Sequence, residues 1–279
     1  MTLATLKDVL GPALAEGYAV AGVVTLGWED MRAYVAAAEA ENAPIILQAG
    51  PGCRAHTPLP ILGTMFRTLA EQATVPVVAH LDHGYTLDEC REAIDCGFSS
   101  VMFDGSRLSL EENITQTGII AALARASGVS CEGEIGFVGY AEGESSTGTI
   151  PEDAAQFAAE TGIDAMAVSV GNVHLQTEAS AGLDTARIAA IQALCDVPLV
   201  IHGGSGVPAT QRTQLARDTA ICKYNIGTEL RMAFGSGLRS VLSSNPDMFD
   251  RNEILKACEP KLVEAARKVI NEISVAPRV

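Results

Sequence analysis

Three of the five histidines stand at the ends of short apolar runs, where they could hold a metal ion together. His83 ends the run VVAHLDH, His174 follows AVSVGNV, and His202 ends LVIH. Three imidazoles with an open fourth position form a catalytic zinc arrangement, in which the metal acts as a Lewis acid on an oxygen. For each histidine alone, a hydrogen-bonded residue near the start of a loop is the simpler interpretation. His56 and His80 lack this context and are interpreted as a surface and a core residue.

Carboxylates near these histidines could assist a metal site. Asp82 directly precedes the first histidine, where it could orient a ligand or transfer a proton, and the sequence leaves both roles open. Glu132 and Glu134 close the run SCEGE, where buried acids need partners, so one of them should face the site. Glu142 and Glu144 belong to the long loop GFVGYAEGESSTGTIPED. Such loops are usually functional or mobile, although a solvated acidic loop explains these two residues more simply.

Two glycine-containing turns could bind an anion. HGGSGVP ends one apolar run, with Ser205 as candidate N-cap of the next helix and Pro208 in its first turn. KYNIGTEL ends the following run. Backbone N–H groups beside glycines and at the starts of helices attract negative charge. In many (β/α)8 barrels a phosphate binds at the loops that follow the last two strands, which is where these two turns would lie. The two turns together favour a phosphorylated ligand over two ordinary helix caps. Their residues are Gly203, Gly204 and Ser205 in the first, and Asn225, Gly227 and Thr228 in the second.

The elements that must position these residues alternate along the whole chain. Short apolar runs, each followed by a segment of helical periodicity, predict eight strands at 18–25, 44–48, 75–80, 99–103, 129–134, 165–170, 197–202 and 220–225. The alternation calls for parallel pairing, and uninterrupted apolar strands indicate a sheet covered on both faces. We predict an α/β fold, a (β/α)8 TIM barrel, with an open doubly wound sheet as the alternative. In a barrel the three histidines meet at the C-terminal face, where active sites of this fold lie.

One domain accounts for the full length of 279 residues. No proline-rich or low-complexity linker divides the chain, so residues 1–279 are assigned to a single barrel domain with extra C-terminal helices at about 229–274. The last helix is long enough to pack outside the barrel or against a second subunit. Seven scattered cysteines without a C-x-x-C pair are interpreted as core residues in a reducing compartment.

The acidic balance argues against nucleic-acid and membrane partners. The chain has 19 basic and 34 acidic side chains, a net charge of −15, and 48% hydrophobic residues. This charge repels phosphate backbones and anionic lipid, while the apolar content suffices for a large core. No apolar run approaches the roughly 18 residues of a membrane span, and the N-terminus lacks a signal-peptide pattern. We expect a globular, cytoplasmic protein.

The order and spacing of the motifs resemble a known enzyme family. HLDHG, EGEIG, the histidine after AVSVGN, PLVIHGGSG and KYNIGTEL follow one another within about residues 18–239. In this combination the chain resembles the class II, metal-dependent ketose-bisphosphate aldolases, nearest to the branch with tagatose-bisphosphate and fructose-bisphosphate aldolases. The resemblance implies a Zn²⁺-dependent lyase that cleaves a phosphorylated ketose, or a related sugar acid phosphate, to dihydroxyacetone phosphate and an aldehyde. It further implies a metal-stabilised enediolate, a monovalent cation beside the zinc, and a homodimer or homotetramer.

The resemblance also assigns roles by position. His83, His174 and His202 match the zinc ligands, and Asp82 matches the acid/base at the cleaved bond. Glu134 matches a carboxylate that serves an alternative metal position in some relatives, and Glu142 matches the loop glutamate that exchanges a proton with dihydroxyacetone phosphate. The phosphate turns correspond to Gly203, Gly204, Ser205, Asn225, Gly227 and Thr228, and Arg231 matches an arginine that grips the far phosphate, often across a dimer interface.

Several positions depart from the family pattern around the substrate. Val24 replaces a usual asparagine, Gly50 a serine, Leu175 and Tyr140 a glycine each, and Gly227 an aspartate. A missing polar contact can cost about 1–3 kcal/mol if its former partner stays buried, which is enough to change specificity by tenfold or more. We therefore expect the reaction type to be retained and the natural substrate to differ from fructose 1,6-bisphosphate.

Other functions remain open from the sequence. A metal-containing sugar-phosphate binding protein without turnover is one alternative, and an aldolase for a pyruvate-type or non-phosphorylated substrate is another. Lys223 is the one lysine on a predicted strand, where a lysine-based aldolase would need its nucleophile. The phosphate turn that begins two residues later favours the metal-dependent chemistry instead.

Overall fold

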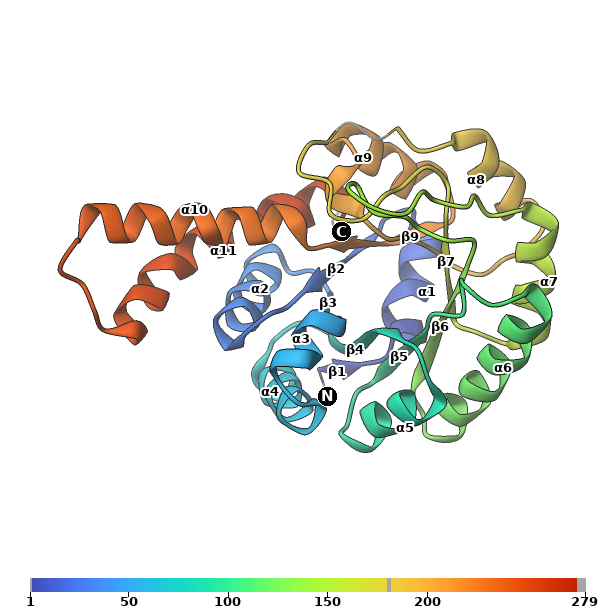
Figure 1. Ribbon diagram of the computed structural model, residues 1–279, viewed down its shortest axis with the longest axis horizontal. Helices are drawn as coiled ribbons and strands as arrows, with labels where there is room; N and C mark the ends of the chain where they lie inside the picture. Colours follow the sequence, from blue (N-terminus) through green and yellow to red (C-terminus); the bar gives the residue numbers. More distant parts are fainter. Residues whose placement is uncertain (1, 180–181, 275–279) are drawn as a thin grey trace.

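Eight parallel strands close into a barrel in the computed structural model, which describes residues 2–179 and 182–274 (Figure 1). The barrel strands are β2 (Val20–Val24), β3 (Ile45–Ala49), β4 (Val77–Gly84), β5 (Ser100–Phe103), β6 (Ser130–Ile135), β7 (Ala165–Val168), β8 (Leu199–Ile201) and β9 (Ile221–Ile226). Strand β2 pairs with β9, and β4 pairs with β5, so the described sheet has no open edge between its first and last strands. The predicted TIM barrel is confirmed, and the open doubly wound sheet is excluded.

A ninth, two-residue strand was not predicted from the sequence. Strand β1 (Leu3–Ala4) pairs with the beginning of β4, at Val77 and Val78. The pairing of β4 with β5 starts only at His80, so β1 covers the part of β4 that β5 does not reach. Two residues are too few for a periodicity signal.

Most of the helices form an outer ring around the barrel (Figure 1). The helices of the described chain are α1 (Leu6–Glu16), α2 (Trp28–Glu41), α3 (Pro51–His56), α4 (Leu59–Gln72), α5 (Leu87–Asp95), α6 (Leu110–Ala126), α7 (Pro151–Thr161), α8 (Thr185–Gln192), α9 (Ala209–Asp218), α10 (Thr228–Ser244) and α11 (Arg251–Ile273). Local signals fix their ends: Ser109 and Glu112 form a capping box at the start of α6, and Gly162, with φ 67°, ends α7.

The first helix seals one end of the barrel. Leu6, Val9, Leu10 and Ala13 of α1 are buried against barrel side chains that include Val78. These barrel side chains include Val20 and Ala165, the first residues of β2 and β7, so the seal lies at the N-terminal ends of the strands. Only the C-terminal end remains available for an active site.

The last two helices leave the barrel as a projecting hairpin (Figure 1). Helix α10 extends outward, and α11 returns along α10 and α2 to the barrel, where the Ala19 N–H donates to the Ile273 carbonyl. The predicted C-terminal helices are therefore present with nearly the expected bounds. His56, the last residue of α3, is exposed and His80 is fully buried, as predicted.

All seven cysteines are free thiols, and five of them are buried. This agrees with their interpretation as small core residues. No helix in the described part of the chain has the length and apolar character needed to cross a membrane.

We predict that Phe66→Ala destabilises the fold by about 3–5 kcal/mol, because Phe66 is fully buried in α4 and packs edge-to-face on Phe98 at 5.4 Å. Ile61→Ala in the same helix is the matched control, since Ile61 is half-exposed and its truncation should change stability by at most about 0.5 kcal/mol. Urea unfolding followed by circular dichroism measures both. Equal effects of the two substitutions would contradict the packing described here.

Candidate active site

A bulge at the end of β4 places two adjacent polar side chains in one pocket. In a regular strand Asp82 and His83 would point to opposite faces. Here the pairing with β5 shifts between Leu81 and Gly84, and His83 adopts the left-handed φ of 53°. Non-glycine residues in this region are strained and cluster at functional sites. The local strain allows both the carboxylate and the imidazole to line the pocket.

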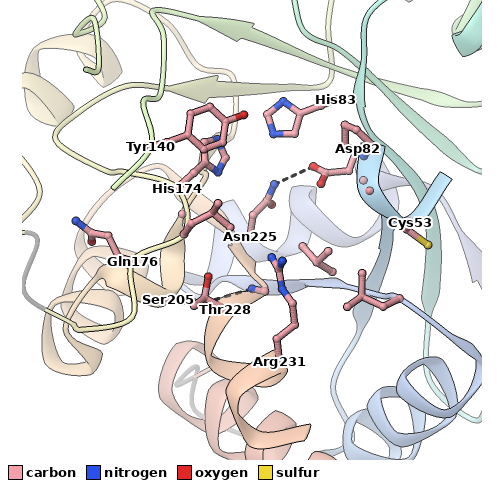
Figure 2. A pocket seen from close by; sticks show the side chains of 18 of the residues that line it. Cys53, Asp82, His83, Tyr140, His174, Gln176, Ser205, Asn225, Thr228 and Arg231 are labelled. Atoms are coloured by element: carbon pink, nitrogen blue, oxygen red, sulfur yellow. Dashed lines mark hydrogen bonds between the residues drawn. The ribbon is translucent and has the colours of Figure 1, made fainter. Parts of the chain in front are cut away.

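The structure brings the three predicted histidines together at the C-terminal end of the barrel. Their ring centroids lie 5.3 Å apart for His83 and His174, 4.6 Å for His83 and His202, and 5.7 Å for His174 and His202. One ring nitrogen of each lies within 4.8 Å of the other two. Figure 2 shows His83 and His174 beside Asp82 in the same pocket.

Two carboxylates determine which ring nitrogen of His83 and His202 faces inward. His83 Nδ1 lies 2.8 Å from Asp104 Oδ2, and His202 Nε2 lies 3.0 Å from Glu132 Oε1. A neutral imidazole that donates through one nitrogen presents a lone pair at the other. His83 Nε2 and His202 Nδ1 therefore face each other, at 3.0 Å. Two facing lone pairs require a proton or a cation between them, so this donor set fits a metal ion.

The electrostatics of the site agree with this assignment. Burial disfavours the charged form of His83, but the negative charges of Asp82, Asp104 and Glu134 outweigh it and raise the pKa of its imidazole to about 9. Burial and the charge of His83 lower the pKa of His174 to about 4, and the same two causes lower the pKa of His202. In the absence of a metal, a proton on His83 Nε2 therefore lies between this nitrogen and His202 Nδ1, at the position that suits a cation.

Both glutamates of β6 point into the barrel, because residues two apart on a strand share a face. The prediction that one of them should face the site agrees with the position of Glu134 among the potential metal ligands. Glu134 Oε2 lies 3.7 Å from His83 Nδ1 and has no hydrogen-bond partner in the described residues, while burial raises its pKa. Together with Asp104 it forms a second group of potential metal ligands around His83. Glu132 lies deeper, against His202.

The two glycine-containing turns are joined by one hydroxyl. Ser205 Oγ accepts hydrogen bonds from the N–H groups of Gly227 and Glu229, both at 3.3 Å, at the start of α10 (Figure 2). The predicted capping role of Ser205 was wrong: it lies in a 3₁₀ turn, Gly204–Gly206, and Pro208 is the N-cap of α9. The hydroxyl caps the helix after the neighbouring strand instead. Gly203 is required here, because a Cβ at its φ of 64° would lie 2.1 Å from the Val173 carbonyl oxygen.

The rim of the pocket carries one predicted cation and two aromatic side chains, of which only Tyr140 was expected near the substrate. Arg231 rises from α10 toward the site, with its Nη2 2.8 Å from the place of a Cβ on Gly227 (Figure 2). Tyr140 stacks on the His174 ring at 5.1 Å and 29°, and Tyr85 is half-exposed nearby. The pocket is lined by Val24, Leu26, Gly50, Pro51, Gly52, Cys53, Asp82, His83, Tyr85, Tyr140, His174, Leu175, Gln176, Gly203, Ser205, Asn225, Gly227, Thr228 and Arg231.

Glu142 is exposed and does not line this pocket. The loop that carries it is held at neighbouring residues: the Ala141 N–H donates to the His174 carbonyl, and Arg107 forms an ion pair of 2.7 Å with Glu144. Any contact between Glu142 and a substrate in the pocket therefore requires the loop to move.

Sequence reasoning missed two supporting residues. Asp104 directly follows β5, so the rule that identified the histidines at strand ends would also have found it. Arg54 donates to the carbonyl oxygens of Ala49, Asp82 and His83 and pairs with Glu89 at 2.6 Å. It holds the strained end of β4, and the sequence contains no motif that indicates this.

Comparison with known proteins places the chain in a family. The fructose-bisphosphate aldolase class-II family model matches residues 4–277. The chain belongs to this family. Fructose-bisphosphate aldolase of Geobacillus stearothermophilus is 36% identical over 91% of each chain, and that of Staphylococcus epidermidis is 33% identical over 100% of this chain and 99% of the relative. The crystal structure of the YdjI aldolase from Escherichia coli K12 superposes with a TM-score of 0.86 at 28% identity, covering 99% of both chains.

Family membership confirms the predicted reaction class. Class II aldolases are metal-dependent lyases that cleave a ketose bisphosphate to dihydroxyacetone phosphate and an aldehyde, so this protein is an aldolase. Lys223 is fully buried and does not line the pocket, so it is not placed to act as a Schiff-base nucleophile.

We predict that metal affinity depends on the proton held by His83. A divalent cation must displace that proton, because the pKa of His83 is raised to about 9 while those of His174 and His202 are lowered. Between about pH 6 and about pH 8 the association constant for Co²⁺ should therefore rise roughly tenfold per pH unit. Competition with a chelator of known pH dependence measures it. An association constant that does not change over this range would contradict the assignment.

Proposed function

We propose that this chain is a Zn²⁺-dependent aldolase whose substrate is a phosphorylated ketose, or a related sugar acid phosphate, other than fructose 1,6-bisphosphate. The observation that carries the proposal is the meeting of His83, His174 and His202 beside Asp82, next to the two turns joined by Ser205. When bound by the three imidazoles, a divalent ion would act as a Lewis acid on the ketose carbonyl oxygen. Glu134 would serve an alternative metal position.

Asp82 is proposed to transfer the proton at the cleaved carbon–carbon bond. Its Oδ1 accepts from Asn225 Nδ2 at 3.2 Å, which fixes the carboxylate, and the residue is 5% exposed at the pocket wall. Oδ2 lies 3.1 Å from the place of a Cβ on Gly50, on the side that has no side chain. This oxygen can accept the proton of a substrate hydroxyl in cleavage and return it in synthesis.

The phosphate of the dihydroxyacetone half is proposed to bind at the two turns. The turns place Gly203, Gly204, Ser205, Asn225, Gly227 and Thr228 around the start of α10, where the helix dipole favours negative charge. Ser205 Oγ satisfies two backbone donors there in the structure described. A phosphate can replace it as their acceptor.

The far end of the substrate is proposed to be recognised differently from that of fructose 1,6-bisphosphate. Val24 and Gly50 offer no side-chain hydrogen bond in the pocket, and the guanidinium of Arg231 occupies the space beside Gly227. One exposed cation among apolar and glycine residues suits an aldehyde fragment that ends in an anionic group.

We also propose a single-domain, cytoplasmic homodimer or homotetramer with no nucleic-acid or membrane partner. Phe249 is 92% exposed between α10 and α11, and Met232 of α10 is half-exposed. These exposed apolar side chains on a projecting hairpin are available for contact with a second copy of the chain. The monovalent cation is proposed on the family resemblance alone.

We predict that Asp82→Asn lowers the rate of ketose cleavage by about 10²–10⁴-fold, because the amide cannot accept the substrate proton, while zinc content stays unchanged. A panel of phosphorylated ketoses, assayed with and without a chelator, identifies the substrate on which to measure it. Asp88→Asn is the control, since its carboxylate is solvent-exposed on α5. Cleavage that survives complete metal removal would rule out the proposed function, and phosphate-dependent binding without any turnover would indicate a binding protein instead.

A second prediction concerns the mobile-loop glutamate. Glu142→Ala should slow deuterium exchange into dihydroxyacetone phosphate and leave zinc content unchanged, because the residue lies on a loop outside the three imidazoles. Nuclear magnetic resonance measures the exchange, and elemental analysis measures the zinc. Loss of zinc in this variant would place Glu142 among the metal ligands and contradict its proposed role.

A further inference from the structure

A buried ion pair lies directly beneath the three histidines and has no place in the reaction described above. Lys223 Nζ lies 2.6 Å from Glu132 Oε2, and both side chains are fully buried in the barrel. Burying two charges costs several kcal/mol per ion before their attraction is counted. A pair at the centre of a barrel, touching a candidate metal ligand, therefore calls for a function.

The hydrogen bonds of this pair form one continuous chain. Glu132 accepts from Lys223 on Oε2 and from His202 on Oε1. Lys223 also lies 3.3 Å from His80 Nε2, and His80 Nδ1 lies 2.8 Å from Ser100 Oγ. Because an ammonium only donates, His80 accepts through Nε2 and donates through Nδ1. Each group in the chain then has a single consistent role.

We propose that the Glu132–Lys223 pair fixes the tautomer of His202, and thereby directs its Nδ1 lone pair toward the other two imidazoles. One carboxylate oxygen holds the proton on His202 Nε2, while Lys223 occupies the other oxygen and keeps the carboxylate in place. Glu132 and Lys223 are thus positioning residues for the metal site. This inference rests on the proposed function.

The count of donors and acceptors makes the proposal testable. Glu132→Gln keeps the shape of the side chain but leaves one acceptor oxygen for two donors. Lys223, which can only donate, takes that oxygen, and the amide NH₂ then faces His202. His202 must move its proton to Nδ1, where it opposes metal binding. Removing the lysine as well, with Lys223→Met, frees the oxygen for His202 and lets the amide donate to His80.

The experiment compares four variants by two measurements. Long-range ¹H–¹⁵N spectra of ¹⁵N-histidine-labelled, metal-free protein report the tautomer of His202, and competition with a chelator gives the Zn²⁺ dissociation constant. We expect Glu132→Gln to weaken Zn²⁺ binding about 10–100-fold, and the double variant with Lys223→Met to recover to within about threefold of wild type. Ser100→Ala, which removes the far end of the chain, is the control that should leave Zn²⁺ affinity unchanged.

A fourth variant keeps the test decisive if Glu132→Gln does not fold. Glu132→Met combined with Lys223→Met has neither charge nor acceptor, so His202 loses its partner. Its Zn²⁺ affinity should be about 10–100-fold below that of the Glu132→Gln, Lys223→Met protein, which differs only by the amide. Equal affinities of these two proteins, or a wild-type tautomer and affinity in Glu132→Gln, would overturn the proposal. Absence of ketose cleavage with the expected tautomers would instead contradict only the aldolase function.

Discussion

The lone pairs of three imidazoles must point at one place, and the rest of the site follows from this constraint. An imidazole can present either nitrogen, so each ring needs a partner that occupies its outer side. Asp104 does this for His83, and Glu132 does it for His202. The result is the 3.0 Å approach of two acceptor nitrogens, which only a proton or a cation stabilises. The elements nearby serve the same geometry: the bulge in β4 turns His83 inward, and Gly203 leaves room for the backbone that carries His174.

The polar side chains that support the histidines and the apolar contacts that stabilise the barrel lie at different ends of it. At the N-terminal end α1 closes the interior mainly with apolar side chains. At the other end Glu132, Glu134, Lys223 and His80 are all buried, and their cost is reduced by mutual hydrogen bonds. Glu134 is the exception, since one of its oxygens has no hydrogen-bond partner in the described part of the chain and burial raises its pKa. A carboxylate that is buried beside imidazoles and incompletely satisfied is what a site adapted to a cation requires, whereas a fold optimised only for stability would place an apolar residue there.

The sequence predicts most of the fold because each barrel strand is a short apolar run followed by an amphipathic helix. Strand β1, with two residues, has too little pattern to be recognised. The site could be predicted only for residues at the C-terminal ends of the strands, because these ends must share one face of the barrel. Glu132 pairs with Lys223 of β9, and Arg54 of α3 contacts the end of β4. Both contacts join residues that are far apart in the sequence, so no local pattern predicts them. The assignment of Ser205 to the wrong helix has the same cause, since its hydroxyl caps a helix that begins after the neighbouring strand.

The departures from the family pattern lie around the pocket mouth, whereas the imidazoles and Asp82 match it. Val24, Gly50 and Gly227 remove polar side chains, and the Arg231 guanidinium lies where an aspartate at 227 would begin. Leu175 keeps the left-handed φ of 61° that suits the family glycine, at a cost of about 1–2 kcal/mol for a residue with a Cβ. Such strain persists only where the surrounding structure holds the backbone in place. Here the preceding residue, His174, is held by backbone hydrogen bonds to the 139–141 segment. The geometry of the metal site therefore fixes the backbone, while the side chains that face the substrate are free to change. This separation would allow the aldolase reaction to be retained with the different substrate proposed above.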